Sequence, residues 1–134
     1  MVKSSFTFAI TIAILNQLTN LIECGMTKAE VDKHLEMGTK LLAAGQLADA
    51  LNQFHTAIDG DPTNYMSFYR RGTVYLGMGK FKSALSDLSR VIELKPDFVS
   101  ARMQRANVLV KQGQFGDAVK DYESIVIFIL LNLI

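Results

Sequence analysis

An internal repeat constrains this chain more than any other feature of its sequence. Residues 33–100 align with themselves at an offset of 34 residues, the interval from Gly38 to Gly72. We call this offset the repeat period. At this offset small and helix-breaking residues coincide: Gly38 with Gly72, Gly45 with Gly79 and Gly113, Ala50 with Ala84 and Ala118, and Pro62 with Pro96. Ala106 falls on the position of Gly38 and Gly72. Coincidences of this number at one offset indicate a structural unit that is repeated along the chain.

Each recurring residue has a physical role in such a unit. Gly38 and its equivalents are expected inside a first helix, where a minimal side chain lets a partner helix come close. Gly45 and its equivalents follow that helix, where the chain needs a left-handed backbone conformation that glycine adopts at a lower energetic cost than other residues. Ala50 and its equivalents mark close contact inside a second helix. Pro62 and Pro96 cannot continue a helix and therefore end it.

A 34-residue unit of two helices is typical of the tetratricopeptide repeat (TPR), whose copies stack into a solenoid. We therefore predict an all-α TPR solenoid of about three antiparallel helix pairs, with repeats at 28–62, 63–96 and, incompletely, 97–124. The expected helices are 28–44 and 47–59, 64–78 and 81–94, and 97–112 with a partner from Phe115 onward. Thr27 and Glu30 have the spacing of a capping box at the first helix. Aromatic residues at matching places are expected to fill the gaps between successive pairs: Phe54 and Tyr122, Phe81 and Phe115.

The segment 1–24 has the pattern of a secretory signal peptide. Lys3 is followed by the apolar run 'FTFAITIAIL', and no further charge occurs before Glu23. This order of a basic start and a short apolar run predicts a signal peptide at 1–24, with cleavage after Cys24. An uncleaved membrane anchor is the alternative, because residues 4–22 are uncharged and about long enough to span a bilayer. The polar residues of its second half, such as Asn16 and Asn20, favour the signal peptide.

The C-terminal end of the chain differs from the repeats before it. Where a proline-marked turn is due near position 130, the chain continues as 'SIVIFILLNLI' from Ser124 to Ile134. This apolar tail, 125–134, is too short to span a bilayer alone. It also lacks the polar outer face on which a solenoid normally ends. We expect a truncated or alternatively spliced product, or an incorrectly assigned gene end, and as an isolated protein it should self-associate through Ile125–Ile134.

Composition and side-chain chemistry favour a binding module over an enzyme. The net charge of +1 gives no electrostatic reason to expect nucleic acid or an acidic membrane surface as a partner. His34 and His55 lie on different helices without a metal-ligand set around them, and no phosphate-binding loop or nucleophile–base pair is evident. Asp59 and Asp61 are read as turn formers, and the other acidic residues as solvated helix faces. The sequence predicts no catalytic residue, no metal site and no cofactor.

The first helices should line the concave groove of the solenoid, and that groove is predicted to be apolar. The candidate client-binding residues are Leu35, Leu42, Met66, Tyr69, Leu76, Met103 and Val110. TPR grooves that grip acidic chaperone C-termini carry Lys, Asn and Arg at set positions, which here hold Leu35, Thr39, Arg70, Ser100 and Gln104. The carboxylate clamp is therefore absent. A groove rich in Leu, Met and Tyr is suited to exposed hydrophobic segments, unless much of it is buried between repeats.

Three stretches resemble a particular group of TPR proteins, the J-domain co-chaperones of the endoplasmic reticulum (ER). They are 'HLEMGTKLLAAGQLADALNQFHTAIDGDPTNY', 'RRGTVYLGMGKFKSAL' and 'DLSRVIELKPDFVSARMQR', and the likeness covers about 34–122. The resemblance implies an ER-lumen location, binding of unfolded or misfolded clients, cooperation with the lumenal Hsp70, and restraint of eIF2α kinases in the unfolded-protein response. These 134 residues hold no J domain and no His-Pro-Asp loop. We therefore expect client holding without direct activation of Hsp70.

The sequence thus predicts a non-catalytic TPR module that holds misfolded client segments in the ER lumen. Two other interpretations stay open. In the first, residues 6–22 remain attached and the chain is a membrane-tethered TPR adaptor. In the second, the chain is a non-functional or interfering fragment that aggregates through its apolar tail.

Overall fold

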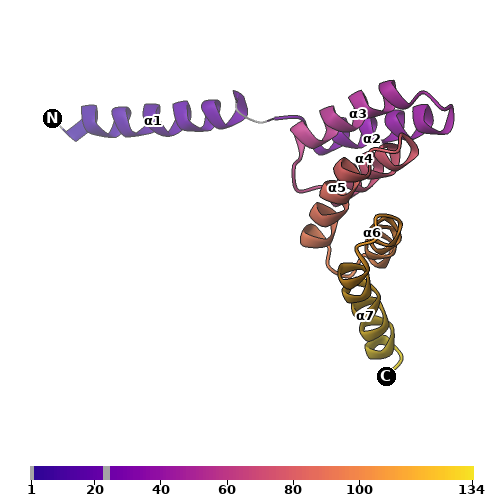
Figure 1. Cartoon of the computed structure of the whole chain (residues 1–134). Coiled ribbons are helices and arrows are strands. Elements are labelled where there is room, and N and C mark those ends of the chain that lie inside the picture. The colour runs from indigo at the N-terminus through magenta and orange to yellow at the C-terminus, as the bar shows by residue number, and fades with distance from the viewer. Residues whose placement is uncertain (1, 23–24) are drawn as a thin grey trace.

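The computed structural model describes residues 2–22 and 25–134 of the chain (Figure 1). Over these residues the chain forms seven α-helices and no strand. Their bounds are α1 Val2–Ile22, α2 Lys28–Ala43, α3 Leu47–Gly60, α4 Tyr65–Gly77, α5 Phe81–Leu94, α6 Val99–Lys111 and α7 Phe115–Asn132. The predicted helix bounds differ from these by two residues at most. The largest difference is at the start of the third pair, which begins at Val99 instead of residue 97.

Six of the helices form a stack of three antiparallel pairs. Helix α2 packs on α3, α4 on α5 and α6 on α7, and the pairs are joined through α3 with α4 and α5 with α6 (Figure 1). Each helix thus packs chiefly on its neighbours in the sequence, as expected for a solenoid. The predicted fold class is confirmed.

The helix ends lie where the sequence placed them. Thr27 and Glu30 form the predicted capping box: the Thr27 hydroxyl accepts from the backbone N–H of Glu30, and the Glu30 carboxylate accepts from the backbone N–H of Thr27. Gly45, Gly79 and Gly113 have φ of 75°, 71° and 73°, the left-handed conformation that ends the first helix of each pair. The second helices α3 and α5 end one residue before Asp61 and Lys95, and a proline follows each of these caps.

The two recurring glycines of the first helices are not equally crowded. A Cβ atom built on Gly38 would lie 2.6 Å from the ring of Phe54, a side chain that is itself fully buried between the helices. At Gly72 the nearest atom would be the Cβ of Asp87 at 3.4 Å, an ordinary contact. The close approach predicted for both positions is therefore a strict requirement at Gly38 alone.

Two aspartates depart from the prediction that acidic residues lie on solvated faces. Asp87 and Asp121 are 4% and 2% exposed, and each is paired with an arginine on the preceding helix. Arg71 donates to Asp87 through Nε (2.8 Å) and Nη2 (2.7 Å), and Arg105 donates to Asp121 through Nε (2.7 Å) and Nη2 (2.6 Å). A bidentate pair satisfies both carboxylate oxygens, which is what makes burial of the charge tolerable.

These hydrogen bonds also hold the arginines in the charged state. The hydrogen bond to Asp121 raises the pKa of Arg105, and the one to Asp87 raises the pKa of Arg71, against the opposing effect of burial. The first pair of helices has no such ion pair, because Met37 takes the place of the arginine.

The third pair corrects two further expectations. Phe115 was expected to fill a gap between repeats, but its side chain is 63% exposed. Its equivalent Phe81 is half-buried because the next pair lies against it, whereas no described helix covers Phe115. Ile125 was counted in the exposed tail, yet it is only 4% exposed, because α7 turns this side chain toward its own pair. The exposed apolar tail therefore begins after Ile125.

Helix α1 projects away from the stacked pairs (Figure 1), and the side chains of residues 5–18 are exposed. Over the described residues, none of the helices has the combination of length and apolar character that crossing a bilayer requires. The predicted cleavage position after Cys24 lies outside the described residues. The signal peptide at 1–24 stays a prediction.

Candidate functional site

The candidate site is the face formed by the first helices α2, α4 and α6. The predicted groove residues lie at different depths on this face. Leu35 and Leu42 are half-buried and pack against the core cluster of Ala50, Phe54 and Val74. Met66 and Leu76 are also half-buried. Met103 and Val110, both on α6, are 39% and 40% exposed. The exposed apolar surface is thus concentrated toward the third pair.

Tyr69 joins the second pair to the third. Its ring meets the ring of Phe98 edge-on, with centroids 4.9 Å apart and planes at 86°. This is a favourable geometry for two aromatic rings. The Tyr69 hydroxyl accepts a hydrogen bond from Nε2 of Gln104 (2.9 Å), which lies on α6. Tyr69 therefore supports the junction of α4 and α6.

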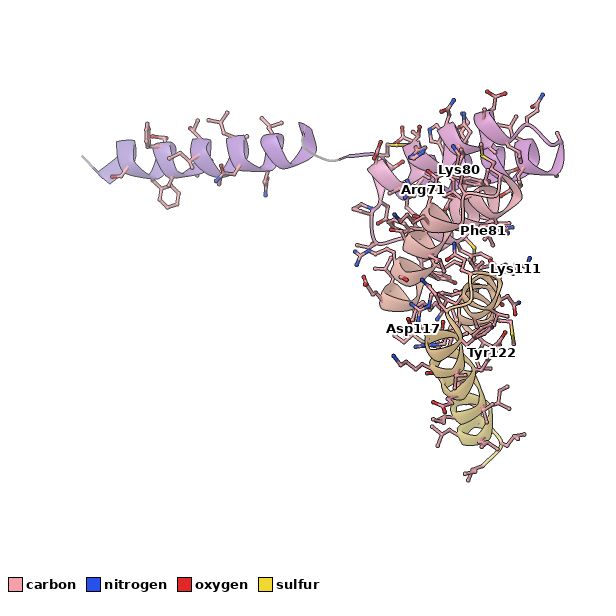
Figure 2. All side chains as sticks on the ribbon, in the orientation of Figure 1. Arg71, Lys80, Phe81, Lys111, Asp117 and Tyr122 are labelled. Atoms are coloured by element: carbon pink, nitrogen blue, oxygen red, sulfur yellow. The ribbon has the colours of Figure 1, made fainter. Side chains whose placement is uncertain are left out.

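A small cavity opens next to this junction. It measures about 230 Å³, and its lining comes from α4, α5 and α6. The lining residues are Leu76, Phe81, Gln104, Asn107, Val108 and Lys111. Phe81 and Lys111 belong to consecutive pairs (Figure 2). The cavity combines an apolar wall with two side-chain amides and one ammonium group, a mixture suited to a peptide segment with an apolar side chain.

Gln104 is one of the polar residues that line this cavity. Its Oε1 atom is buried and has no hydrogen-bond partner among the described residues, while its Nε2 is committed to Tyr69. A buried acceptor without a partner is costly, and because this atom is closed to solvent, a peptide N–H would reach it only after the Gln104 side chain moved. The groove threonines have no hydroxyl proton free to bind a peptide, since the Thr39 and Thr73 hydroxyls donate to the backbone carbonyls of Leu35 and Tyr69.

The sequence-based prediction of this site missed Gln104, Phe81 and Lys111. Gln104 was considered only as a departure from the carboxylate clamp. Phe81 was assigned to packing between repeats, and Lys111 was passed over at the end of its helix. The sequence did hold a signal for Phe81 and Lys111. Phe81 begins the second helix of one pair and Lys111 ends the first helix of the next pair, and stacking of the pairs brings these two helix ends close together.

The described residues show no group of three or more His, Cys, Asp or Glu side chains arranged to hold a metal ion. The two histidines take part in contacts between helices. His34 Nδ1 lies 2.7 Å from Oε1 of Gln53 on α3. His55 Nδ1 lies 2.9 Å from Nη1 of Arg71 on α4.

Comparison with known proteins agrees with this architecture. The tetratricopeptide repeat family matches residues 65–98 with one profile and residues 35–76 with another. The chain carries tetratricopeptide repeats, and its fold is an all-α TPR solenoid.

The particular protein it resembles is DnaJ homolog subfamily C member 3. It is 71% identical to the Homo sapiens protein over 49 residues and 69% identical to the Gallus gallus protein over 49 residues. The matched segment is 37% of this chain and only 10% of the length of those relatives. A crystal structure of the P58(IPK) TPR domain is 60% identical with a TM-score of 0.70, covering 72% of this chain and 27% of that one.

More distant TPR structures share the fold alone. The second TPR of Spaghetti (RPAP3), solved with the HSP90 peptide SRMEEVD, is 20% identical with a TM-score of 0.70. That likeness covers 74% of this chain and 92% of the other. The comparisons support a protein-interaction role for the repeats.

Proposed function

We propose that this chain is the client-binding TPR module of an ER co-chaperone, without catalytic activity of its own. It holds unfolded or misfolded polypeptide segments on the face formed by α2, α4 and α6. Through its resemblance to DnaJ homolog subfamily C member 3, we assign it to the ER lumen, with the lumenal Hsp70 and eIF2α kinases as further partners in the unfolded-protein response. The chain contributes client holding to this system.

The observation that carries the proposal is the 60% identity to the P58(IPK) TPR domain, joined to an exposed apolar surface on the same helices. Met103 and Val110 are exposed on α6, and the cavity beside Leu76 is partly apolar. Pockets that enclose small ligands measure about 300–1,000 Å³. A cavity of about 230 Å³ is smaller, so it is suited to one apolar side chain of an extended segment.

Binding to this face should be weak and tolerant of sequence. Met103 and Met66 have flexible, polarisable side chains, which repack around varied apolar partners. The polar contribution comes from Gln104 and Lys111, neither of which forms a fork-like anchor for a carboxylate. A client is therefore recognised by an exposed apolar side chain with its backbone, more than by a fixed sequence.

The test is binding of reduced, carboxymethylated α-lactalbumin, a soluble unfolded polypeptide, to the full chain. Met103→Asp places a charge on the proposed face and should weaken binding roughly tenfold, about 1.4 kcal/mol. Met37→Asp is the matched control, because Met37 is also on a first helix and is 42% exposed, but lies off the groove positions. Circular dichroism establishes that both variants keep the helix content of the wild type.

Equal affinity of the two variants for the unfolded polypeptide would show that clients bind elsewhere. A second variant addresses the deeper residues of the face. Met66→Asp with Leu76→Asp should abolish binding if the chain stays folded. Retention of wild-type binding by that folded double variant would refute the assignment of Leu35, Leu42, Tyr69 and their neighbours as the client surface.

A further inference from the structure

The second helices of the three pairs carry one apolar face in one register. Four positions, spaced by four, three and four residues, form a continuous stripe on a helix. The stripes are Leu47, Leu51, Phe54 and Ile58 on α3, Phe81, Leu85, Leu88 and Ile92 on α5, and Phe115, Val119, Tyr122 and Val126 on α7. On α3 and α5 the first helix of the next pair covers the outer part of this stripe, since α4 packs on α3 and α6 on α5, while Phe54 and Leu88 also lie against Gly38 and Gly72 of their own pairs.

The stripe on α7 is uncovered in the described chain. Ile92 on α5 is 8% exposed, whereas its equivalent Val126 on α7 is 55% exposed; Leu85 is half-buried, whereas its equivalent Val119 is 50% exposed. A cavity of about 380 Å³ lies along the open stripe, and its lining is almost entirely apolar. It is lined by Val119, Tyr122, Glu123, Val126 and Ile127. Apolar surface of this kind on a folded protein marks an interaction site.

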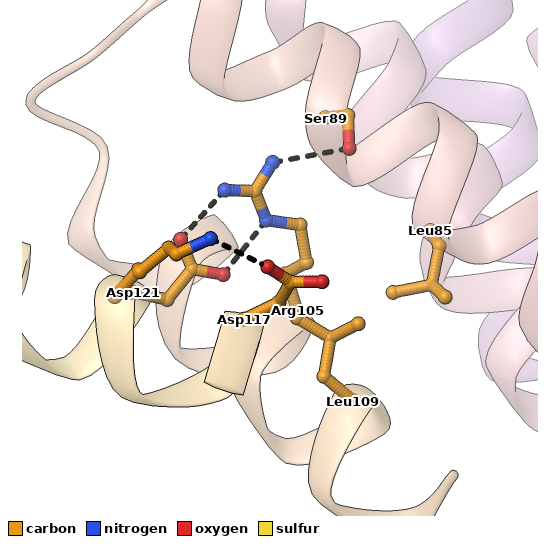
Figure 3. A pocket seen from close by; sticks show the side chains of 7 residues that line it. Leu85, Ser89, Arg105, Leu109, Asp117 and Asp121 are labelled. Atoms are coloured by element: carbon orange, nitrogen blue, oxygen red, sulfur yellow. Dashed lines mark hydrogen bonds and ion pairs between the residues drawn. The ribbon is translucent and has the colours of Figure 1, made fainter. Parts of the chain in front are cut away.

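An arginine crosses each of the two covered junctions at the same place. Nη1 of Arg71 on α4 lies 2.9 Å from Nδ1 of His55 on α3. Nη1 of Arg105 on α6 donates to the Ser89 hydroxyl on α5 at 3.1 Å (Figure 3). His55 and Ser89 are one repeat period apart, and the next residue in the series is Glu123 on α7. Each second helix therefore presents an acceptor where the covering helix brings its arginine.

Glu123 is the strongest acceptor of the three, and it is open. It is exposed at the rim of the apolar cavity on α7, and no hydrogen bond or ion pair joins it to another described residue. A carboxylate can take both N–H groups of a guanidinium, whereas an imidazole or hydroxyl takes one. The open face thus combines an apolar stripe with an acidic acceptor at the arginine position.

The covering helices also share a small buried residue four positions before the arginine. Ser67 precedes Arg71 on α4, and Ala101 precedes Arg105 on α6; both Ser67 and Ala101 are 0% exposed. A larger side chain there would hold the two helices apart. A helix that covers this kind of stripe therefore carries a small residue followed four residues later by arginine.

We propose that the α7 face, defined by Phe115, Val119, Tyr122, Glu123 and Val126, docks a TPR-like helical hairpin of another polypeptide. The first helix of that hairpin carries a small residue and, four residues later, an arginine that pairs with Glu123. The proposal goes beyond client holding, because the face is on α7 and apart from the client-binding helices. It concerns a folded partner with a defined register, whereas clients are unfolded segments.

The course of α7 favours a partner in trans. Helices α3 and α5 end at Gly60 and Leu94, and the turn that follows brings the next helix back onto the stripe. The equivalent position on α7 is Phe128, but α7 continues as a helix to Asn132. The turn that would return a following segment at this point is replaced by helix.

A second copy of this chain fits the face poorly in head-to-tail stacking. The one first helix with an open outer face is α2, which holds Lys33 where Ser67 and Ala101 stand and Met37 where the arginines stand. Docking of α2 on α7 would bury the Lys33 ammonium at the small-residue position and leave Glu123 without a cation. The same comparison shows how to convert α2 into a matching helix.

The test uses two forms of the full chain. The donor carries Lys33→Ser and Met37→Arg, which recode the outer face of α2, and Val119→Lys, which closes its own α7 face. The receiver is the wild-type chain. Donor and receiver should form a one-to-one complex in sedimentation velocity, and a donor that retains Met37 should bind roughly tenfold more weakly or worse. Receiver Glu123→Lys should show a similar loss, with Glu123→Gln intermediate.

Three results would overturn the proposal. The first is the absence of any complex when circular dichroism shows donor and receiver folded. The second is equal binding to wild-type and Glu123→Lys receivers, since contact would then be unspecific apolar adhesion. The third is a homodimer of the wild-type chain that Val119→Lys dissociates and with which the donor does not compete. In that case a second copy of the chain would occupy the α7 face.

Discussion

Alanine at the two recurring glycines should have unequal effects on stability, although both glycines lie inside first helices. Glycine to alanine in a helix gains about 1 kcal/mol in propensity. At Gly72 the added methyl group meets only ordinary contacts, the nearest at 3.4 Å, so Gly72→Ala should stabilise the chain by roughly that amount. At Gly38 the methyl group would lie 2.6–2.9 Å from three atoms of the Phe54 ring.

The Phe54 ring cannot retreat, because it is fully buried between α2 and α3. Overpacking of a well-packed core costs about 1–3 kcal/mol. The gain in propensity is common to both variants and cancels in their comparison. The free energy of unfolding of Gly38→Ala should therefore lie about 1–3 kcal/mol below that of Gly72→Ala. The measurement is urea unfolding of the full chain, followed by helix signal.

A double-mutant cycle identifies the cause. Phe54→Leu removes the ring edge that the new methyl group meets, so Gly38→Ala should cost less in that background, with a coupling of about 1 kcal/mol or more. Equal stability of Gly38→Ala and Gly72→Ala would show that the Phe54 ring imposes no limit at Gly38. An equal cost of Gly38→Ala with Phe54 and with leucine at position 54 would show that the ring is not the cause.

Three further predictions address the charges and the turns. Asp121→Asn should destabilise the chain by about 3 kcal/mol, the low end for a broken buried pair, because the Arg105 side chain that loses its anionic partner is 24% exposed. Asp117→Asn, at an exposed ion pair, should change stability by less than about 1 kcal/mol; urea unfolding measures both. Gly79→Ala should cost about 1 kcal/mol because φ is 71°, and Gly77→Ala should not destabilise, which thermal unfolding can compare. The backbone hydrogen bond from Thr27 lowers the pKa of Glu30 below its ordinary value. Ionised Glu30 therefore stabilises the folded state at pH values above the pKa of Glu30 in the unfolded chain, and this stabilisation is lost as the pH falls through its pKa in the folded chain. Glu30→Gln should flatten that part of the curve of unfolding free energy against pH.

The repeat period predicted the helix pairs because each turn is determined locally. Gly45 and Pro62 act through backbone conformation at their own positions, and Thr27 caps a helix that begins one residue later. Properties of this kind need no knowledge of distant contacts. The helix bounds, the capping box and the left-handed glycines followed from the residues alone.

Burial could not be predicted in the same way, because it depends on which pair lies next. Asp87 and Asp121 are polar residue types that usually lie in solvent. Their burial required a partner on the preceding helix. The repeat held the missing signal, since Arg71 and Arg105 recur one period apart, and so do Asp87 and Asp121. Two oppositely charged residues that recur together indicate a pair.

The candidate groove shows the same division between local and non-local information. Met103 is open because no further first helix packs over it in the described chain, while Leu35 is drawn toward the core around Phe54. Positions that are equivalent in the repeat therefore differ in exposure. The period identifies the face, and the stack decides how much of each side chain remains for a client.

The most direct test of client binding is methyl NMR of the full chain labelled at methionine, titrated with reduced, carboxymethylated α-lactalbumin. Met66 and Met103 lie on the proposed client-binding face, and Met37 lies on a first helix outside it. The account predicts that the methyl signals of Met66 and Met103 shift or broaden while that of Met37 is unchanged. A titration that proves binding but leaves Met66 and Met103 unchanged, or perturbs Met37 equally, would contradict it.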